Sequence, residues 1–299
     1  MKKKAFIYII VAGILWGTSG LFANALNEYG FSSLQMTAMR GLVSFLCMLG
    51  YVLIKDRGLL KVTPIDLLFF LENGIALFST AFLYYTTMQM TSVATAVVLM
   101  YTMPIMVMIY SVIFFKERMT GMKLCATVVM FVGCCLVSGI IGGFRADVFG
   151  ILLGLLSGIT YSVYSILTKT EFKRGASPIT TSLYGFGFMS IIALLICRPV
   201  EIVERTTSPK IFILLIGLGV VTFVIPYFLY TLSLKYLPAG TASALSIVEP
   251  MAATVFGIIF LRQIPDIFAG IGIVLIILAV FLLGVAESRL DKSKENTNE

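Results

Sequence analysis

The sequence predicts an all-α integral membrane protein with ten transmembrane helices. Its composition is the first reason, because 59% of the 299 residues are hydrophobic and only 12% are charged. Ordinary soluble domains carry about 25% charged residues. The second reason is the recurrence of apolar runs of about 20 residues, the length that a membrane-spanning helix needs. The third is an internal repeat, in which sequence motifs of the first half of the chain recur in the same order in the second half.

Ten apolar runs define the expected spans, and the connections between them are short. The runs are 5–26, 32–54, 65–88, 92–113, 121–140, 149–168, 178–197, 211–233, 239–261 and 267–286. Short connections leave no room for a soluble domain, so lipid is the main solvent of this chain. The polar tail 288–299 is expected to be disordered.

The distribution of lysine and arginine predicts the orientation of the spans. Arg40 lies within a span, and 16 of the 22 basic residues fall on the side of the N-terminus. The other five are Arg145, Arg198, Arg205, Lys210 and Arg262. Because cytoplasmic loops carry the excess of positive charge, both termini are expected to be cytoplasmic, in a plasma (inner) membrane.

The two halves of the chain match when one is shifted along the other. A shift of 146 residues places Tyr84, Thr95, Ala96 and Pro104 over Tyr230, Thr241, Ala242 and Pro250. A shift of 141 places Gly13-x-x-x-Gly17 over Gly154-x-x-x-Gly158. Each half holds five spans, an odd number, so the second half must cross the membrane in the opposite sense. Inverted repeats of this kind are typical of secondary transporters with a site at the midplane.

These motifs resemble those of EamA-type proteins of the drug/metabolite transporter superfamily. The similar elements are Gly13-Ile-Leu-Trp-Gly17, Arg40, Pro104, Lys116-Glu117-Arg118 and Val248-Glu249-Pro250. The resemblance implies two inverted five-helix repeats, 1–140 and 149–287, and transport of small metabolites, amino acids prominent among them. The sequence departs from the family after span 9, where Gln263 stands in place of an acidic residue.

Three ionisable residues lie well inside the expected spans, where a charge costs about 2.5–3.5 kcal/mol to insert. Glu249 lies ten residues into its span, about 15 Å deep. It is a candidate to bind a substrate amino group or to carry a proton, and the alternative is a static salt bridge to Arg40. Arg40 is a candidate to hold a carboxylate, to neutralise Glu72 or to brace span 2. Glu72 and the adjacent Asn73 are candidate cavity-lining residues.

Prolines and glycines mark equivalent positions in the two halves. Pro104 and Pro250 are expected to bend spans 4 and 9 and to open a central cavity; a static kink is the alternative. Glu249 aligns with Met103, so only one of these two helices carries the charge. Gly13, Gly17, Gly154 and Gly158 permit close helix contact, so we expect spans 1 and 6 to pack tightly.

Aromatic residues complete the set of candidates for a substrate-binding cavity. They are Trp16, Tyr84, Tyr101, Tyr161, Tyr164, Tyr227 and Tyr230, with the repeat-related Tyr84 and Tyr230 ranked first. These two, Trp16 and Tyr101 join Glu249, Arg40, Glu72 and Asn73 as the eight predicted site residues. Aromatic rings bind apolar groups and cations. Tyrosines also form interfacial belts in membrane proteins, so a structural role remains open for each of them.

The leading hypothesis is therefore a secondary transporter of amino acids or related metabolites, acting as an exporter. A multidrug or quaternary-amine extruder is the alternative within transport, and a channel or membrane scaffold is the alternative of another class. The chain has no histidine and no G-x-x-x-x-G-K-[ST] motif, so neither an enzyme nor an ATP-driven pump is expected. We expect no cofactor, metal or nucleic acid. The sequence leaves room for a homodimer.

Overall fold

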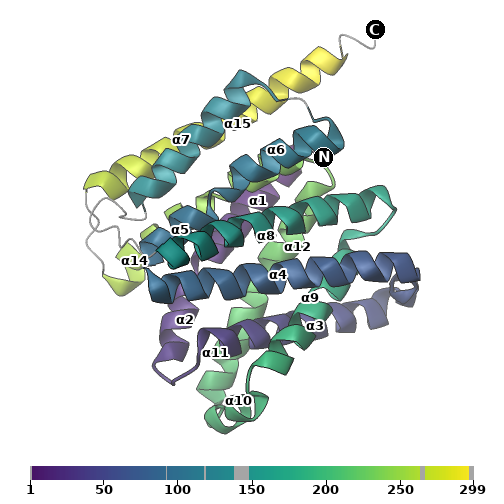
Figure 1. Ribbon diagram of the computed structural model, residues 1–299, viewed down its shortest axis with the longest axis vertical. Helices are drawn as coiled ribbons and strands as arrows, with labels where there is room; N and C mark the ends of the chain where they lie inside the picture. Colours follow the sequence, from purple (N-terminus) through teal and green to yellow (C-terminus); the bar gives the residue numbers. More distant parts are fainter. Residues whose placement is uncertain (1, 92, 118, 138–147, 263–266, 296–299) are drawn as a thin grey trace.

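The computed structural model describes residues 2–91, 93–117, 119–137, 148–262 and 267–295, and in these ranges the chain is folded as a bundle of helices (Figure 1). The helices are α1 Lys2–Gly17, α2 Ser19–Asn27, α3 Ser33–Lys55, α4 Pro64–Met90, α5 Val93–Met100, α6 Met103–Phe115, α7 Gly121–Val137, α8 Val148–Lys173, α9 Pro178–Ile196, α10 Pro199–Arg205, α11 Pro209–Gly219, α12 Ile225–Leu234, α13 Ala239–Leu245, α14 Val248–Leu261 and α15 Ile267–Glu295. A 3-10 turn, η1, covers Arg57–Leu60, and a π-helical turn, η3, covers Val220–Val224.

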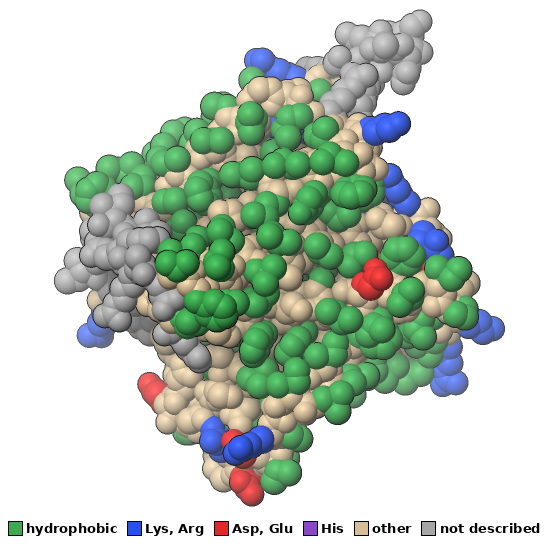
Figure 2. Space-filling model, viewed as in Figure 1, with side chains coloured by type: hydrophobic (Ala, Val, Ile, Leu, Met, Phe, Trp, Pro, Cys, Tyr) green, Lys and Arg blue, Asp and Glu red, His purple; other side chains and the backbone are tan. Residues whose placement is uncertain are grey.

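The prediction of ten membrane-spanning helices is confirmed. Within the described ranges, nine helical runs are long and apolar enough to cross a membrane, and α7 is a shorter apolar helix between two of them. Four spans consist of more than one helix: α1 with α2, α5 with α6, α11 with η3 and α12, and α13 with α14. In Figure 2 the broad face of the bundle is covered by hydrophobic side chains, as contact with lipid requires.

The C-terminal segment differs from expectation. Helix α15 continues to Glu295, beyond the expected end of the last span at residue 286, so residues 288–295 are helical. The remaining four residues lie outside the described part.

Helix packing relates the two halves of the chain by a pseudo-two-fold axis. Span 2 packs on span 7, span 5 on span 10, span 3 on span 6 and span 1 on span 8. The close contacts repeat as well: a Cβ built on Gly74 would lie 2.5 Å from Phe188 Cβ, and one built on Gly219 would lie 2.5 Å from Val43 Cβ. A shift of 145 residues relates both partners of these two contacts, so the inverted repeat is visible at single residues.

The helix starts explain how several of these elements form. Ser32 caps α3 in a capping box with Gln35, and Ser177 caps α9, with the Thr180 N–H donating to its hydroxyl at 3.1 Å. A proline occupies the first turn of α9, where the missing N–H costs nothing. Helices α6 and α14 end on equivalent basic residues, Lys116 and Arg262, each at φ 53°, which places positive charge at the negative end of the helix dipole.

The bundle has two ends, called the N-terminal end and the far end. The N-terminal end carries the N-terminus and the connections 56–63, 174–177 and 235–238, and lies to the right in Figure 1. The far end carries the connections 28–32 and 206–208.

Spans 4 and 9 are both interrupted at their centres. The regular α-helical pattern breaks at residues 101–102 and again at 246–247, where Thr102 and Ile247 donate to carbonyls three residues back. Pro104 and Pro250 lie in the first turn of the helix that follows each break. The two broken spans pack against the two glycine pairs. A Cβ on Gly17 would lie 2.7 Å from Ala252 Cβ of α14, and one on Gly154 would lie 2.8 Å from Leu99 Cβ of α5. Spans 1 and 6 therefore pack tightly, each against the broken span of the opposite half.

Candidate functional site

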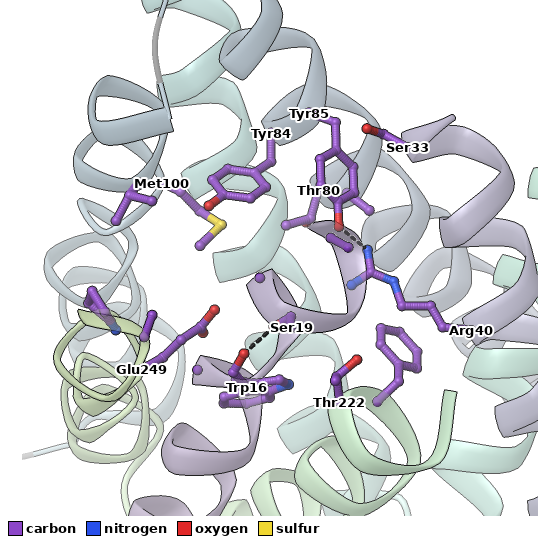
Figure 3. A pocket seen from close by; sticks show the side chains of 18 of the residues that line it. Trp16, Ser19, Ser33, Arg40, Thr80, Tyr84, Tyr85, Met100, Thr222 and Glu249 are labelled. Carbon is purple, nitrogen blue, oxygen red and sulfur yellow. Dashed lines mark hydrogen bonds between the residues drawn. The ribbon is translucent and has the colours of Figure 1, made fainter. Parts of the chain in front are cut away.

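A central cavity of about 360 Å³ lies between spans 1, 2, 3, 4, 6, 8 and 9, within the usual size range of small-molecule sites. Its lining extends from the exposed Asn24 and Asn27 of α2 to Glu249 at the start of α14. The cavity is therefore open at the far end of the bundle. Figure 3 shows the side chains that surround it.

Glu249 lies on one wall of the cavity, in the first turn of α14. The break in span 9 creates a helix N-terminus at this point, whose partial positive charge favours a carboxylate. Tyr101, at the equivalent break in span 4, donates from its hydroxyl to Glu249 Oε2 at 2.6 Å. The two helix breaks thus bring together a carboxylate and a phenol from opposite halves of the chain.

Arg40 of α3 lies on the opposite wall, across the cavity from Glu249 (Figure 3). Its Nη2 donates to the hydroxyl of Tyr85 at 2.7 Å, and its Cζ lies 5.4 Å from the Tyr85 ring centroid and 5.5 Å from that of Phe223. Its Nε is buried without a hydrogen-bond partner. Among the described residues, no ion pair joins Arg40 to Glu249 or Glu72 in this conformation.

Aromatic rings form the floor of the cavity towards the N-terminal end. Trp16 packs edge-on against Tyr227 with ring centroids 5.0 Å apart, and its indole N–H is buried without a partner. Beneath it, Tyr230 contacts Trp16, Tyr161 and Tyr164. The Tyr230 hydroxyl lies 2.8 Å from Ser165 Oγ, which fixes this ring in place.

The structure brings five of the eight predicted site residues to one cavity: Trp16, Arg40, Tyr84, Tyr101 and Glu249. Their roles in substrate binding remain predictions. Tyr161 and Tyr227, which belonged to the wider aromatic set, also line it.

Three predicted residues lie elsewhere. Glu72 is exposed on the outer surface of α4, and Asn73 is buried against α8, where it donates to Thr168 and Glu171. Successive residues on a helix point about 100° apart, so one side chain of the pair turns outward and the other inward, and neither lines the cavity. Tyr230 is fully buried in the layer beneath the cavity floor.

Several cavity residues were absent from the prediction. Thr80, Tyr85, Thr222 and Phe223 all line the cavity. Thr80 carried a usable signal, because it lies four residues before Tyr84 and so shares its helix face. Tyr85 and Phe223 carried none, since an aromatic residue in an apolar span is ordinary packing material.

Ion pairs close the N-terminal end of the bundle. Lys169 of α8 contacts Glu117 after α6, and its ammonium also donates to the Leu237 carbonyl at 3.0 Å. Lys123 of α7 contacts Glu287 of α15, and the side chains of this second pair are only 6% and 5% exposed. Charges that the sequence places near the membrane boundary therefore neutralise one another at this end.

Comparison with known proteins agrees with this architecture. The chain is 27% identical over 276 residues to an uncharacterized transporter of Archaeoglobus fulgidus, covering 92% of this chain and 94% of the relative. It is 26% identical to the uncharacterized transporter YwfM of Bacillus subtilis, covering 96% of each. A solved crystal structure, 18% identical, superposes with a TM-score of 0.81 over 97% of this chain and 99% of its own length, which shows a shared fold.

The family match covers both halves of the chain separately. Residues 3–139 and 148–285 each match the same family, so the repeat read from the sequence corresponds to two copies of one family unit, as in the drug/metabolite transporter superfamily. The chain is a multi-pass membrane protein and belongs to the EamA-like transporter family.

Proposed function

We propose that the protein exports amino acids or closely related zwitterionic metabolites by alternating access around the central cavity. The observation that carries this proposal is the placement of Arg40 and Glu249 on opposite walls of one cavity (Figure 3). Each charged group is held by a tyrosine, and neither is neutralised by the other.

Such a cavity complements a zwitterion. The guanidinium of Arg40 can hold a carboxylate in bidentate fashion, while Glu249 can accept hydrogen bonds from an ammonium group. The surrounding rings favour an apolar or aromatic substrate side chain.

Exchange of cargo for protons that enter the cell sets the direction of transport as export. We place the far end outside because lysine and arginine gather along the opposite edge (Figure 2). Glu249 is then reached by external protons, and a proton that binds there and leaves on the inside would drive cargo outwards. A multidrug or quaternary-amine extruder would also use Glu249 and the aromatic walls, but would have no use for Arg40.

The test combines variants of the two charged residues with cargo that lacks one charge. Proteoliposomes are loaded with a mixed metabolite pool, and release is followed by mass spectrometry with and without a pH gradient. The transported amino acid is then compared with its amide, which lacks the carboxylate, and its hydroxy-acid analogue, which lacks the ammonium group.

The expected results differ between the two variants. Arg40→Gln should weaken transport of the amino acid by about 10- to 100-fold, the loss of one charged hydrogen-bonding partner, and leave transport of the amide unchanged. Glu249→Gln should weaken transport of the amino acid to a similar extent and leave transport of the hydroxy acid unchanged. It should also remove any dependence on the pH gradient. Arg198→Gln, just before α10, and Glu204→Gln, on α10, change exposed side chains and are the matched controls. Equal losses for all three cargoes, or transport of amines alone, would contradict the proposal.

The proposed orientation has its own measurement. Single cysteines at positions 55 and 116 should react with an impermeant thiol reagent only from the cytoplasm, and those at 145 and 205 only from outside. The reverse pattern would place the cavity opening on the inside.

A further inference from the structure

A second buried carboxyl group lies outside the cavity, where α4, α8 and α9 meet near the N-terminal end. Glu171, in the last turn of α8, is 2% exposed, and its Oε1 accepts from the Asn73 amide at 3.0 Å. The same amide nitrogen donates to Thr168 Oγ1 at 3.0 Å. Asn73 and Thr168 are 1% and 0% exposed, so this group of side chains has no contact with the surface.

Nearby cations do not compensate this carboxyl group. On α8, Lys169 pairs with Glu117 and Lys173 lies over the Phe115 ring. Just after α8, Arg174 pairs with Asp66 at 2.9 Å. From α4, Asp66 adds a like charge. From α9, the Thr181 hydroxyl lies beside Glu171 but makes no hydrogen bond of normal geometry, and Glu171 Oε2 has no partner either.

An ionised carboxylate in this position would be costly, because a buried charge is tolerated only when it is paired and hydrogen-bonded. A bound proton removes that charge. The proton also gives Glu171 Oε2, which has no hydrogen-bond partner, an O–H group to donate. The Thr181 hydroxyl is the acceptor within reach.

A metal cation fits this place less well than a proton. Glu171 Oε1 is occupied by an amide donor, and Asn73 Oδ1 turns towards α9, where a Cβ on Gly185 would lie 3.1 Å from it. In the part of the chain that the structure describes, no three His, Cys, Asp or Glu side chains form a group that could hold a metal ion.

The pseudo-two-fold axis gives this group of side chains a position in the transport cycle. The shift of 141 residues that relates spans 1 and 6 maps Asn27 onto Thr168. The shift of 145 that relates Ser32 to Ser177 at the starts of spans 2 and 7 maps Met36 onto Thr181. Asn27 and Met36 both line the cavity where it opens at the far end. Two of the residues beside Glu171, Thr168 and Thr181, therefore occupy the position of an equivalent mouth at the N-terminal end, packed shut in this conformation.

We propose that Glu171 is a proton-binding site that keeps the N-terminal end of the bundle closed while it is protonated, and that opening of this end releases the proton. Opening would hydrate the carboxyl group and allow it to ionise, so the open form binds one proton fewer than the closed form. By linkage, the ratio of closed to open molecules falls up to tenfold for each unit of pH increase. The proposal involves no substrate, so it stands or falls separately from the function proposed above.

The experiment measures the opening directly as a distance. Spin labels are placed at positions 176 and 235, in the two connections that flank the mouth, in the full chain without its five native cysteines. The protein is held in lipid nanodiscs, and the distance distribution is recorded by pulsed electron resonance from acid to alkaline pH. The expected result is one short distance at low pH and a growing population of a longer distance as the pH rises.

Variants assign the effect to Glu171. Glu171→Gln, which cannot ionise, should keep the short distance at every pH, whereas Glu171→Asp should retain the pH response. Glu204→Gln, an exposed carboxyl group at the far end, should behave as the wild type. Loss of the response in Glu171→Gln alone supports the proposal. A pH-independent wild type, or a Glu171→Gln protein that opens as the wild type does, overturns it.

A second measurement covers the case in which Glu171→Gln does not fold. At neutral pH the wild type should show an infrared C=O absorption from a protonated carboxyl group, and Glu171→Asp should shift it. An absorption that is absent, or unchanged in Glu171→Asp, overturns the proposal.

Discussion

The two ends of the bundle are built from equivalent elements, yet they treat charge in opposite ways. In the cavity that opens at the far end, Arg40 donates to the Tyr85 hydroxyl and Glu249 accepts from the Tyr101 hydroxyl. At the N-terminal end, Lys169 and Glu117 contact directly, and so do Lys123 and Glu287. The two charged groups of the cavity do not pair with each other, whereas these charged groups at the N-terminal end form ion pairs.

The difference teaches that pseudo-symmetry of the backbone does not extend to the chemistry. The breaks in spans 4 and 9 are equivalent, but the residue at the second break is Glu249 and its counterpart is Met103. The carboxyl group near the midplane therefore belongs to span 9 alone and has no counterpart in span 4. Charge, close packing and hydroxyl pairing each contribute to this arrangement, and single substitutions can remove them one at a time.

Removing one partner of an ion pair at the closed end should have the largest effect. The side chains of Lys169 and Glu117 are each only 17% exposed. Lys169→Met leaves Glu117 charged and without its partner, which should lower the free energy of unfolding by about 3 kcal/mol. Arg198→Met removes a partner whose side chain is 85% exposed, and should cost less than about 1 kcal/mol. Unfolding titrations in mixed detergent micelles give both values, and equal losses would mean that the closed end is not held by charge.

Adding a methyl group at the close contact between spans 1 and 9 should have an intermediate effect. A Cβ at Gly17 would lie 2.8 Å from the backbone nitrogen of Ala253, whereas at Gly13 the nearest atom is Val248 Cβ at 3.1 Å. Gly17→Ala should therefore lower the free energy of unfolding by about 1–3 kcal/mol, and Gly13→Ala by less.

Gly50 provides the control for this pair. No atom lies within 4 Å of a Cβ at that position, so Gly50→Ala should leave the protein as stable or raise its stability by about 0.5–1 kcal/mol. Thermal unfolding of the three purified variants ranks them. If Gly13→Ala and Gly17→Ala both lose little stability and by the same amount, then spans 1 and 9 are free to separate.

The smallest effect is expected at a hydroxyl pair between the two ends. Thr80 of α4 donates to Thr160 of α8 at 2.9 Å, and hydrogen bonds of this kind between membrane helices average about 0.6 kcal/mol. A double-mutant cycle with Thr80→Val and Thr160→Val should return a coupling energy of that size. Additive single effects would show that the interface between spans 3 and 6 relies on packing alone.

The fold followed from the sequence because its signals are long and repeated. Apolar runs of membrane length and ordered matches between the halves specify the ten spans and their inversion. Glu249 and Arg40 could be singled out because a charge inside a span is too costly to occur without a reason.

The rotation of each helix about its axis was not readable in the same way. Lipid and neighbouring helices are both apolar, so a span such as α4 lacks the clear apolar stripe that orients a helix in a soluble protein. That is why Glu72 and Asn73 were both assigned to the cavity. The contacts of Glu171 and Lys169 were likewise invisible, because they join residues that lie far apart in the chain.

The opposed charges of the cavity have an electrical consequence. A zwitterion has no net charge, and Arg40 and Glu249 together add none when both are ionised, so the membrane voltage neither drives nor opposes passage of the proposed cargo itself. A proton carried on a carboxyl group is different, because each elementary charge that crosses the membrane is worth about 2.3 kcal/mol per 100 mV. Any current that accompanies transport would therefore count protons rather than cargo molecules.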